Sequence, residues 1–302
     1  MLRDPNGVLR RLVILTRPGG ALLIALVPCL FLFFAHWDRA IGFRAWGVFG
    51  LLMASWLALH CGTMWLNANL DRDEGGVLFG KSCSIPDYTE LWGYGALGLS
   101  ILLASWIGPK VALLSMGCSA LAIAYSHPEV RWKGHSVLGP LVNIVGYGLL
   151  SPLAGLWASG LPLTSRSLAV ASTAVPFVLG CYLVAQSFQG EEDAARGYRT
   201  FVVTHGVSFV IRAAKSCFHL FFLQFLLLAA IGWLPRAVLA LVIPYGLLVI
   251  GFRDWEGTAN VRTASQARLV MQHLTSAAVV MLVAMLAHQI ASVSLHGPSA
   301  GL

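Results

Sequence analysis

The chain has 302 residues, of which 57% are hydrophobic and only 11% are charged, and its mean hydropathy is +0.75. A soluble domain carries about 25% charged residues, so this composition excludes a soluble globular protein and indicates a polytopic membrane protein. The net charge of +7 does not indicate nucleic-acid binding, because the Lys and Arg residues are scattered through short connectors.

Apolar runs along the chain predict the helices. A helix that crosses a bilayer needs about 20 mainly apolar residues, and runs of this length recur from the N-terminal region to the C-terminal region. We therefore expect an all-α, multi-pass membrane protein with about nine transmembrane helices. These lie near residues 18–37, 44–68, 90–108, 109–126, 136–159, 166–188, 213–233, 235–252 and 269–294.

The basic residues predict the orientation of these spans. With nine spans, the N-terminus and every second connector share one face, which carries fifteen of the 20 Lys and Arg, and the other face carries five. Because basic connectors stay inside, we expect the N-terminus and that face to be cytoplasmic. Of the 13 Asp and Glu, only Asp38 falls on the outer face. A cation site on the inner face would explain this gathering, and ordinary solvation of loops is the alternative.

An acidic cluster, Asn-Ala-Asn-Leu-Asp-Arg-Asp-Glu, follows the second span at residues 67–74. Asn67 and Asp71 are four residues apart, so they share one face of a continuing helix. Their oxygens can converge on one hard cation such as Mg²⁺, which keeps waters and substrate phosphates as its other ligands. Asp73 and Glu74 add charge within about one turn. A solvated acidic helix end is the alternative interpretation.

Basic and polar residues follow the fourth span. Arg131 and Lys133 lie on the predicted inner face, and a guanidinium and an ammonium both suit the oxygens of a diphosphate. Alternatively, these two positive charges only determine the orientation of the spans in the membrane. Asn143 lies one to two turns into the fifth span, where its amide must find a partner, either in a site or on a neighbouring helix.

A second acidic cluster follows the sixth span and repeats the arrangement of the first. Gln189 and Asp193 are four residues apart, Glu192 lies beside them, and Arg196 and Arg199 supply positive charge. Taken alone, this segment also fits a solvated loop. Two acidic helix ends on one face favour a site that holds divalent cations, and such cations hold a diphosphate.

These residues together resemble the motifs of the UbiA superfamily of intramembrane prenyltransferases. That family has an Asn-xxx-Asp-type motif after the second helix, a Tyr/Ser…Arg…Lys element after the fourth and an Asp-xxx-Asp-type motif after the sixth. The likeness runs from about residue 17 to residue 206, and Gly75 and Gln189 depart from it, since Asp is common at both positions. The matching residues are Asn67, Asp71, Tyr125, Ser126, Arg131, Lys133, Gln189 and Asp193.

The resemblance implies one transmembrane prenyltransferase domain over residues 1–302, with helices around a central cavity. It implies Mg²⁺ as the cofactor, an isoprenyl diphosphate as the donor, and a lipophilic acceptor from the membrane, such as an aromatic compound, a quinone precursor or another lipid. The expected catalytic residues are Asp71, Asp193, Tyr125 and Asn143. The expected diphosphate ligands are Arg72, Lys81, Arg131, Lys133 and Arg199. The expected metal ligands are Asn67, Asp71, Asp73, Glu74, Gln189, Glu192 and Asp193.

Other motifs in the chain do not indicate a further chemistry. Residues 75–82 match the Gly-x-x-x-x-Gly-Lys-Ser phosphate-loop pattern, but that loop works between a strand and a helix, so we expect no nucleotide. The six cysteines contain no CxxC pair. His60 falls inside the second span, where a histidine is usually a helix–helix hydrogen-bond partner.

Two other functions stay open. A terpene cyclase on the same scaffold would ionise the diphosphate without an acceptor. A non-enzymatic lipid transporter would carry charged residues near the bilayer midplane, whereas this chain places its carboxylates at the ends of spans.

Overall fold

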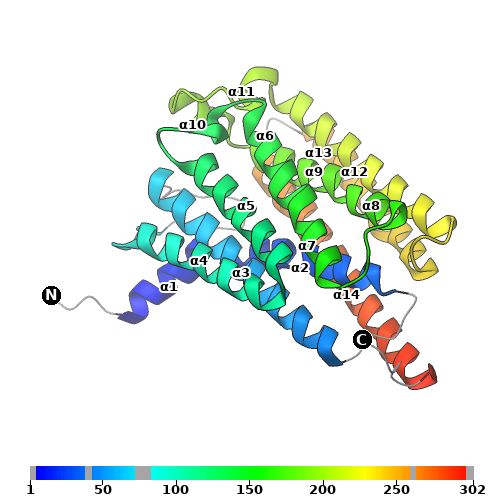
Figure 1. Cartoon of the computed structure of the whole chain (residues 1–302). Coiled ribbons are helices and arrows are strands. Elements are labelled where there is room, and N and C mark those ends of the chain that lie inside the picture. Colours follow the sequence, from blue (N-terminus) through cyan, green and yellow to red (C-terminus); the bar gives the residue numbers. More distant parts are fainter. Residues whose placement is uncertain (1–4, 38–42, 72–82, 259–262, 297–302) are drawn as a thin grey trace.

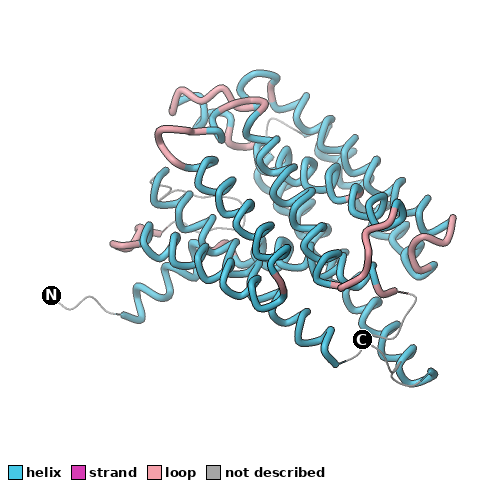
Figure 2. Tube along the Cα trace, in the orientation of Figure 1, coloured by secondary structure: helices cyan, strands magenta, loops and turns pink. Residues whose placement is uncertain are grey.

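The computed structural model describes residues 5–37, 43–71, 83–258 and 263–296, and these residues form helices joined by loops (Figure 2). One isolated β-bridge, between His135 and Arg199, is the only strand-like pairing in the described part of the chain. The elements in chain order are α1 (Pro5–Leu15), α2 (Pro18–Ala35), α3 (Phe43–Asp71), α4 (Thr89–Ile107), α5 (Pro109–Ser126), η1 (Trp132–Gly134), α6 (Leu138–Asn143), η2 (Ile144–Leu150), α7 (Ser151–Ala158), α8 (Ser165–Ser172), α9 (Ala174–Gln186), α10 (Gly190–Ala195), α11 (Phe201–His205), α12 (Val207–Ala230), η3 (Arg236–Leu241), α13 (Val242–Thr258) and α14 (Thr263–His296).

The described residues contain nine helical segments long and apolar enough to span a membrane, which confirms the predicted number. Most boundaries agree within a few residues. The seventh segment begins six residues earlier than expected and the ninth five residues earlier, because their first turns carry polar residues that hydropathy alone excludes. The segments are 18–35, 46–71, 89–107, 109–126, 138–158, 165–186, 207–230, 236–253 and 264–291.

The helices form one bundle, in which α3, α4 and α5 lie together on one side and α9, α12 and α13 on the other (Figure 1). In lipid, helices associate through close van der Waals packing rather than through hydrophobic burial. Two glycines permit this packing. A Cβ on Gly62 of α3 would lie 2.8 Å from the carbonyl oxygen of Gly93 in α4, and a Cβ on Gly155 of α7 would lie 2.1 Å from the carbonyl oxygen of Pro28 in α2.

The fifth span changes its helical type halfway. Residues Ile144–Leu150 form a π-helix between the α-helical turns of α6 and α7. The hydroxyl of Ser151 donates to the carbonyl oxygen of Gly146 at 3.0 Å, and the indole of Trp56 on α3 donates to Ser151 at 2.8 Å. A π-helix widens the helix and displaces its side chains, and such segments often occur at functional sites.

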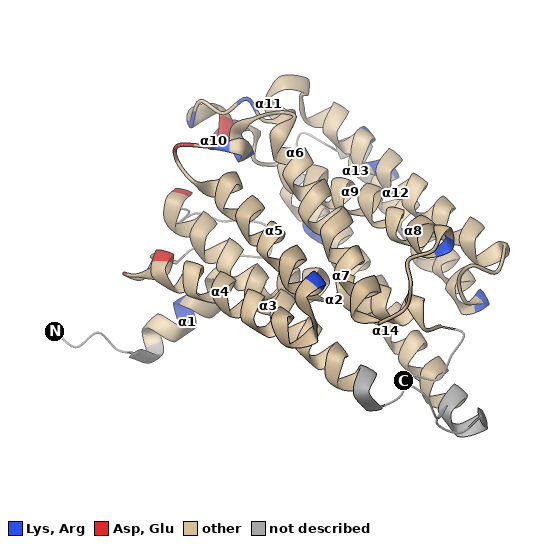
Figure 3. Ribbon diagram, in the orientation of Figure 1, with Lys and Arg blue, Asp and Glu red and all other residues tan. Residues whose placement is uncertain are grey.

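Short elements cover one end of the bundle. The backbone N–H of Arg199 donates to the carbonyl oxygen of Gly134 at 2.8 Å, so the connection after α5 is joined to the segment after α10. The tips of α3 and α10 and the start of α4 carry acidic residues at this same end (Figure 3). The described residues of the two predicted clusters, whose matching positions are 122 residues apart in the sequence, therefore lie at one end of the fold.

Candidate active site

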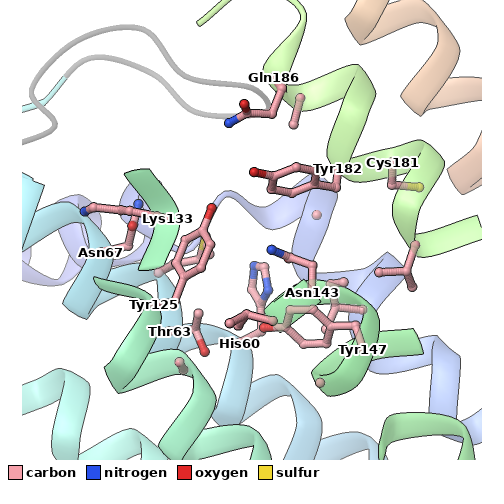
Figure 4. Close-up of a pocket in the computed structure, with 18 of the residues that line it drawn as sticks. His60, Thr63, Asn67, Tyr125, Lys133, Asn143, Tyr147, Cys181, Tyr182 and Gln186 are labelled. Carbon is pink, nitrogen blue, oxygen red and sulfur yellow. The ribbon is translucent and has the colours of Figure 1, made fainter. Parts of the chain in front are cut away.

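A cavity of about 270 Å³ lies among α2, α3, α5, α6, α9 and α10, and Figure 4 shows the side chains that surround it. Its lining combines residues from both acidic clusters with residues from the middle of the bundle. Eight of the expected catalytic, diphosphate and metal residues line this one cavity: Asn67, Asp71, Tyr125, Lys133, Asn143, Gln189, Glu192 and Asp193.

Helix α3 contributes a stripe of residues to the cavity wall. His60, Thr63, Met64, Asn67 and Asp71 all line it, and their spacing is that of one helix face. Asp71 is the last residue of the helix, and the Ser126 hydroxyl of α5 donates to the Asn67 side-chain oxygen at 3.2 Å. The predicted one-face pairing of Asn67 with Asp71 therefore belongs to a longer stripe that runs into the bundle.

Lys133 connects the two acidic segments. Its ammonium forms an ion pair with the Asp71 carboxylate, and both side chains are buried, with 7% and 6% of their surface exposed. The ammonium also lies 6.0 Å from the ring centroid of Tyr198. Burial and, to a smaller extent, the nearby Arg196 lower the pKa of Lys133 to about 8, although Asp193 acts in the opposite direction. Lys133 therefore lies between Asp71 at the tip of α3 and the α10 segment.

Backbone and side-chain bonds hold Asp193 in place. Its N–H donates to the carbonyl oxygen of Gln189 at 2.8 Å, so both residues lie in one helical turn, as their spacing predicts. The Thr200 hydroxyl donates to the Asp193 carboxylate at 2.8 Å, and the Tyr198 N–H donates to the Asp193 carbonyl oxygen at 2.9 Å. Asp193 is buried, so its carboxylate is fixed in the cavity wall.

Two arginines line the cavity that were not among the expected diphosphate ligands. Arg196 forms an ion pair with Glu192 at 2.6 Å, one helical turn before it. Arg17 lies between α1 and α2 in a left-handed conformation with φ of 51°, directly before Pro18. The cavity therefore balances its carboxylates with three cations, and the end that contains Asp71, Lys133 and Asp193 is its mouth.

Some expected residues lie elsewhere. Arg131 and Arg199 are exposed and do not belong to the cavity lining, and Arg131 has a left-handed backbone with φ of 50°. Four expected residues fall outside the described residues: Arg72, Asp73, Glu74 and Lys81.

The sequence profile of the UbiA prenyltransferase family matches residues 25–275. The chain belongs to this family. The match covers the cavity residues of α3, α5, α6, α9 and α10. Among curated protein sequences, the comparison found no match.

Solved structures of UbiA homologues share the fold. A homologue from Archaeoglobus fulgidus, solved with GPP and Mg²⁺, is 16% identical over 94% of this chain and 99% of its own, with a TM-score of 0.65. A homologue from Aeropyrum pernix K1 without ligand is 13% identical over 86% of this chain and 97% of its own, with a TM-score of 0.62. A digeranylgeranylglyceryl phosphate synthase is 13% identical over 95% of this chain and 99% of its own, with a TM-score of 0.61.

Several polar residues of this UbiA-family cavity were not found from the sequence. The side-chain oxygen of Gln186 and the hydroxyl of Tyr182 are buried without a hydrogen-bond partner among the described residues, and both residues line the cavity. His60, Thr63 and Tyr147 line its opposite end (Figure 4). Helical spacing from Asn67 and Asp71 would have indicated His60 and Thr63, whereas nothing in the local pattern distinguishes Gln186.

The donor set at the mouth fits magnesium. Among the described residues, no three His, Cys, Asp or Glu side chains are grouped as a metal site. The cavity nevertheless offers carboxylate oxygens from Asp71, Glu192 and Asp193. It also offers the side-chain oxygen of Gln186, which accepts no hydrogen bond from the described residues. Hard oxygen ligands in small number, completed by water and phosphate, are the usual environment of Mg²⁺.

A second, apolar chamber of about 70 Å³ adjoins the cavity. Leu23, Val27 and Phe177 line both spaces, so these side chains form the boundary between them. The walls of the chamber come from α2, α9, α12 and α14, and five further phenylalanines dominate them: Phe31, Phe34, Phe221, Phe222 and Phe225.

Proposed function

We propose that this protein is a Mg²⁺-dependent intramembrane prenyltransferase. In this proposal the whole chain forms one prenyltransferase domain, with its charged cavity mouth on the cytoplasmic side. The isoprenyl group passes from an isoprenyl diphosphate to a lipophilic acceptor, such as an aromatic compound, a quinone precursor or another lipid.

The observation that carries the proposal is the shared cavity of the two acidic segments. Asp71 from α3 and Asp193 from α10 line the same space, and the Lys133 ammonium pairs with the first and lies near enough to the second to respond to its charge. Two carboxylates and a buried lysine at one point form a site for a cation and a polyanion together. Bound between the carboxylates, Mg²⁺ would offset the negative charge that collects on the diphosphate as its bond to the isoprenyl carbon breaks.

Residues of this chain supply the remaining parts of the mechanism. Lys133 and Arg196 place positive charge at the mouth, where each can donate to phosphate oxygens and favour departure of the diphosphate, and Arg17 adds a third cation to the cavity lining. Tyr125 and Asn143 lie further into the cavity, on the path between the mouth and the bundle centre (Figure 4). Apolar side chains such as Val27 and Phe177 exclude water from the reacting carbon, so the acceptor is the nucleophile.

Substituting the two carboxylates tests the proposal. Asp71→Asn and Asp193→Asn should each lower prenyl transfer at least 100-fold, on the order of 3 kcal/mol of lost electrostatic stabilisation. The measurement incubates purified protein with Mg²⁺, geranyl diphosphate and a panel of lipophilic acceptors and detects products by mass spectrometry. EDTA should abolish the same product.

Glu129→Gln is the matched control, because Glu129 is an exposed carboxylate in the connection after α5 that does not line the cavity. Full turnover by either Asp variant, or turnover in EDTA, would remove the carboxylates from the reaction. A cyclic hydrocarbon formed from geranyl diphosphate without acceptor would instead favour a cyclase.

A further inference from the structure

Helix α1 has 11 residues, which span about 16 Å, so it is too short to cross a bilayer. It packs on α3, where the indole N–H of Trp65 donates to the carbonyl oxygen of Leu12 at 2.9 Å. Trp65 lies about 9 Å along the helix axis before Asp71, the last residue of its span. At the other end, Arg17 connects α1 to Pro18, the first residue of the first span. These connections place α1 at the membrane boundary, where it projects from the bundle (Figure 1).

Apolar residues occupy two sides of α1, but the bundle covers only one of them. Leu12 and Leu15 are buried against the protein, whereas Leu9 is 63% exposed and Val13 is 51% exposed. Leu9 and Val13 are four residues apart, so they form one stripe on the helix surface. At the membrane boundary, a helix with such a stripe inserts it about 5–10 Å into the layer between headgroups and acyl chains.

The two arginines of α1 lie on different sides of this stripe. Successive residues of a helix are rotated by about 100°, which places Arg11 nearly opposite Leu9 and Val13. The Arg11 guanidinium donates to the Ser84 hydroxyl at 3.0 Å, in the segment before α4. Arg10 instead flanks the stripe on the side away from the bundle, and it is exposed. Because α1 contains no acidic residue, its exposed side combines apolar surface with positive charge, which complements a lipid surface with anionic headgroups.

We propose that α1 is an interfacial anchor that binds an anionic phospholipid. Leu9 and Val13 insert among the acyl chains, and the Arg10 guanidinium donates to the headgroup phosphate. The occupant is lipid because the stripe lies at the depth of the membrane boundary and the charge beside it is positive. This anchor concerns the attachment of the protein to one leaflet, so it does not depend on the reaction proposed above.

Spin labelling of the full chain in nanodiscs of phosphatidylcholine and phosphatidylglycerol tests the insertion. In a background with the six native cysteines replaced, nitroxides on Leu9→Cys and Val13→Cys should be more accessible to oxygen than to a water-soluble nickel chelate. Glu129→Cys, at an exposed position in the connection after α5, should show the reverse. Higher nickel accessibility of the stripe would place it in water, and low accessibility to both reagents would mean that another protein surface covers it. Either result would overturn the proposal.

Quenching by labelled lipids tests the headgroup. A bimane on Val13→Cys reports the local ratio of quenching by doxyl-labelled phosphatidylglycerol to quenching by doxyl-labelled phosphatidylcholine, each added to a phosphatidylcholine bilayer. The anionic lipid should quench more, and Arg10→Gln should lower the ratio about fivefold, the contribution of one basic residue near an anionic surface. Arg11→Gln is the matched control, because it removes the same charge from the side of α1 that is bonded to Ser84, and it should change the ratio little. An unchanged ratio in Arg10→Gln, or an equal fall in Arg11→Gln, would contradict the contact between Arg10 and the lipid.

Discussion

The ammonium of Lys133 interacts with a carboxylate from each acidic segment, Asp71 and Asp193. Its ammonium is paired with Asp71, and its buried position holds it within the cavity lining. In the proposed function, a substrate diphosphate brings negative charge to this point, so the ammonium can exchange a carboxylate partner for phosphate oxygens without leaving the site. Arg131, two residues earlier, is exposed and turned by its left-handed backbone, so the two predicted basic residues occupy different environments.

Lys133→Met should therefore raise the KM for geranyl diphosphate about ten- to hundredfold, since a hydrogen bond to a charged group contributes about 1.5–3 kcal/mol. Steady-state kinetics with varied geranyl diphosphate measure the change. Arg131→Met should have a much smaller effect. Lys110→Met controls for loss of a lysine, because Lys110 lies over Trp157 and away from the cavity. Equal effects of Lys133→Met and Arg131→Met would contradict this ranking.

Thr200 positions Asp193 without lining the cavity itself. Thr200→Val removes the hydroxyl that donates to the Asp193 carboxylate and keeps the side-chain shape. Loss of such a supporting bond typically weakens metal binding by about 10- to 100-fold, so the Mg²⁺ concentration for half-maximal transfer should rise by this factor. Thr200→Ser keeps the hydroxyl and should behave as the wild type. A Mg²⁺ titration of transfer that is identical for Thr200→Val would disprove the positioning role.

At the scale of elements, α2 and α7 pack so closely at Gly155 that a side chain at this position has no room. An added Cβ on Gly155 would meet backbone atoms of Pro28 and Leu32, which cannot rotate away, whereas one on Gly95 of α4 would meet nothing within 4 Å. Leu23 and Val27 of α2 line the cavity, so separation of these helices also displaces the cavity wall.

Gly155→Ala should lower the melting temperature in detergent by several degrees, because overpacking costs about 1–3 kcal/mol. Prenyl transfer should fall with it. Gly95→Ala should leave the melting temperature unchanged or slightly raised, since alanine favours a helix interior by about 0.5–1 kcal/mol. Thermal unfolding followed by intrinsic fluorescence distinguishes the two variants, and an unaffected Gly155→Ala would show that the helices are not in close contact.

The sequence predicts elements better than it predicts the site. Long apolar runs define nine spans because a bilayer demands length and hydropathy, both of which are local. The paired residues of each acidic cluster also follow from helical spacing. By contrast, the π-helix at 144–150 accompanies bonds from Cys118 of α5 to Gly146 and from Trp56 of α3 to Ser151. The buried Lys133 likewise precedes Gly134, which is bonded to Arg199. These tertiary contacts leave no local pattern.

For the whole molecule, the fold places a charged cavity mouth and an apolar chamber side by side. In the proposed function, the mouth receives the diphosphate, and the chamber between α2, α9, α12 and α14 suits an isoprenyl tail. The chamber is bounded by phenylalanines on three helices, α2, α9 and α12, and by smaller apolar residues of α14, so no single segment of the sequence indicates it. The location of the mouth relative to the membrane then decides from which compartment a water-exposed diphosphate enters.

The distribution of basic residues predicts that the mouth faces the cytoplasm, and labelling of introduced cysteines tests this orientation. In a background with the six native cysteines replaced, Glu129→Cys in the connection after α5 and Pro162→Cys in the connection after α7 both place a thiol at an exposed position. These connections precede and follow the same span, 138–158, so they lie on opposite sides of the membrane. A membrane-impermeant maleimide should label Pro162→Cys in intact cells and Glu129→Cys only after permeabilisation, because basic connectors stay inside. The reverse pattern would place the acidic mouth outside, where the positive-inside rule would not account for the fifteen basic residues on its face.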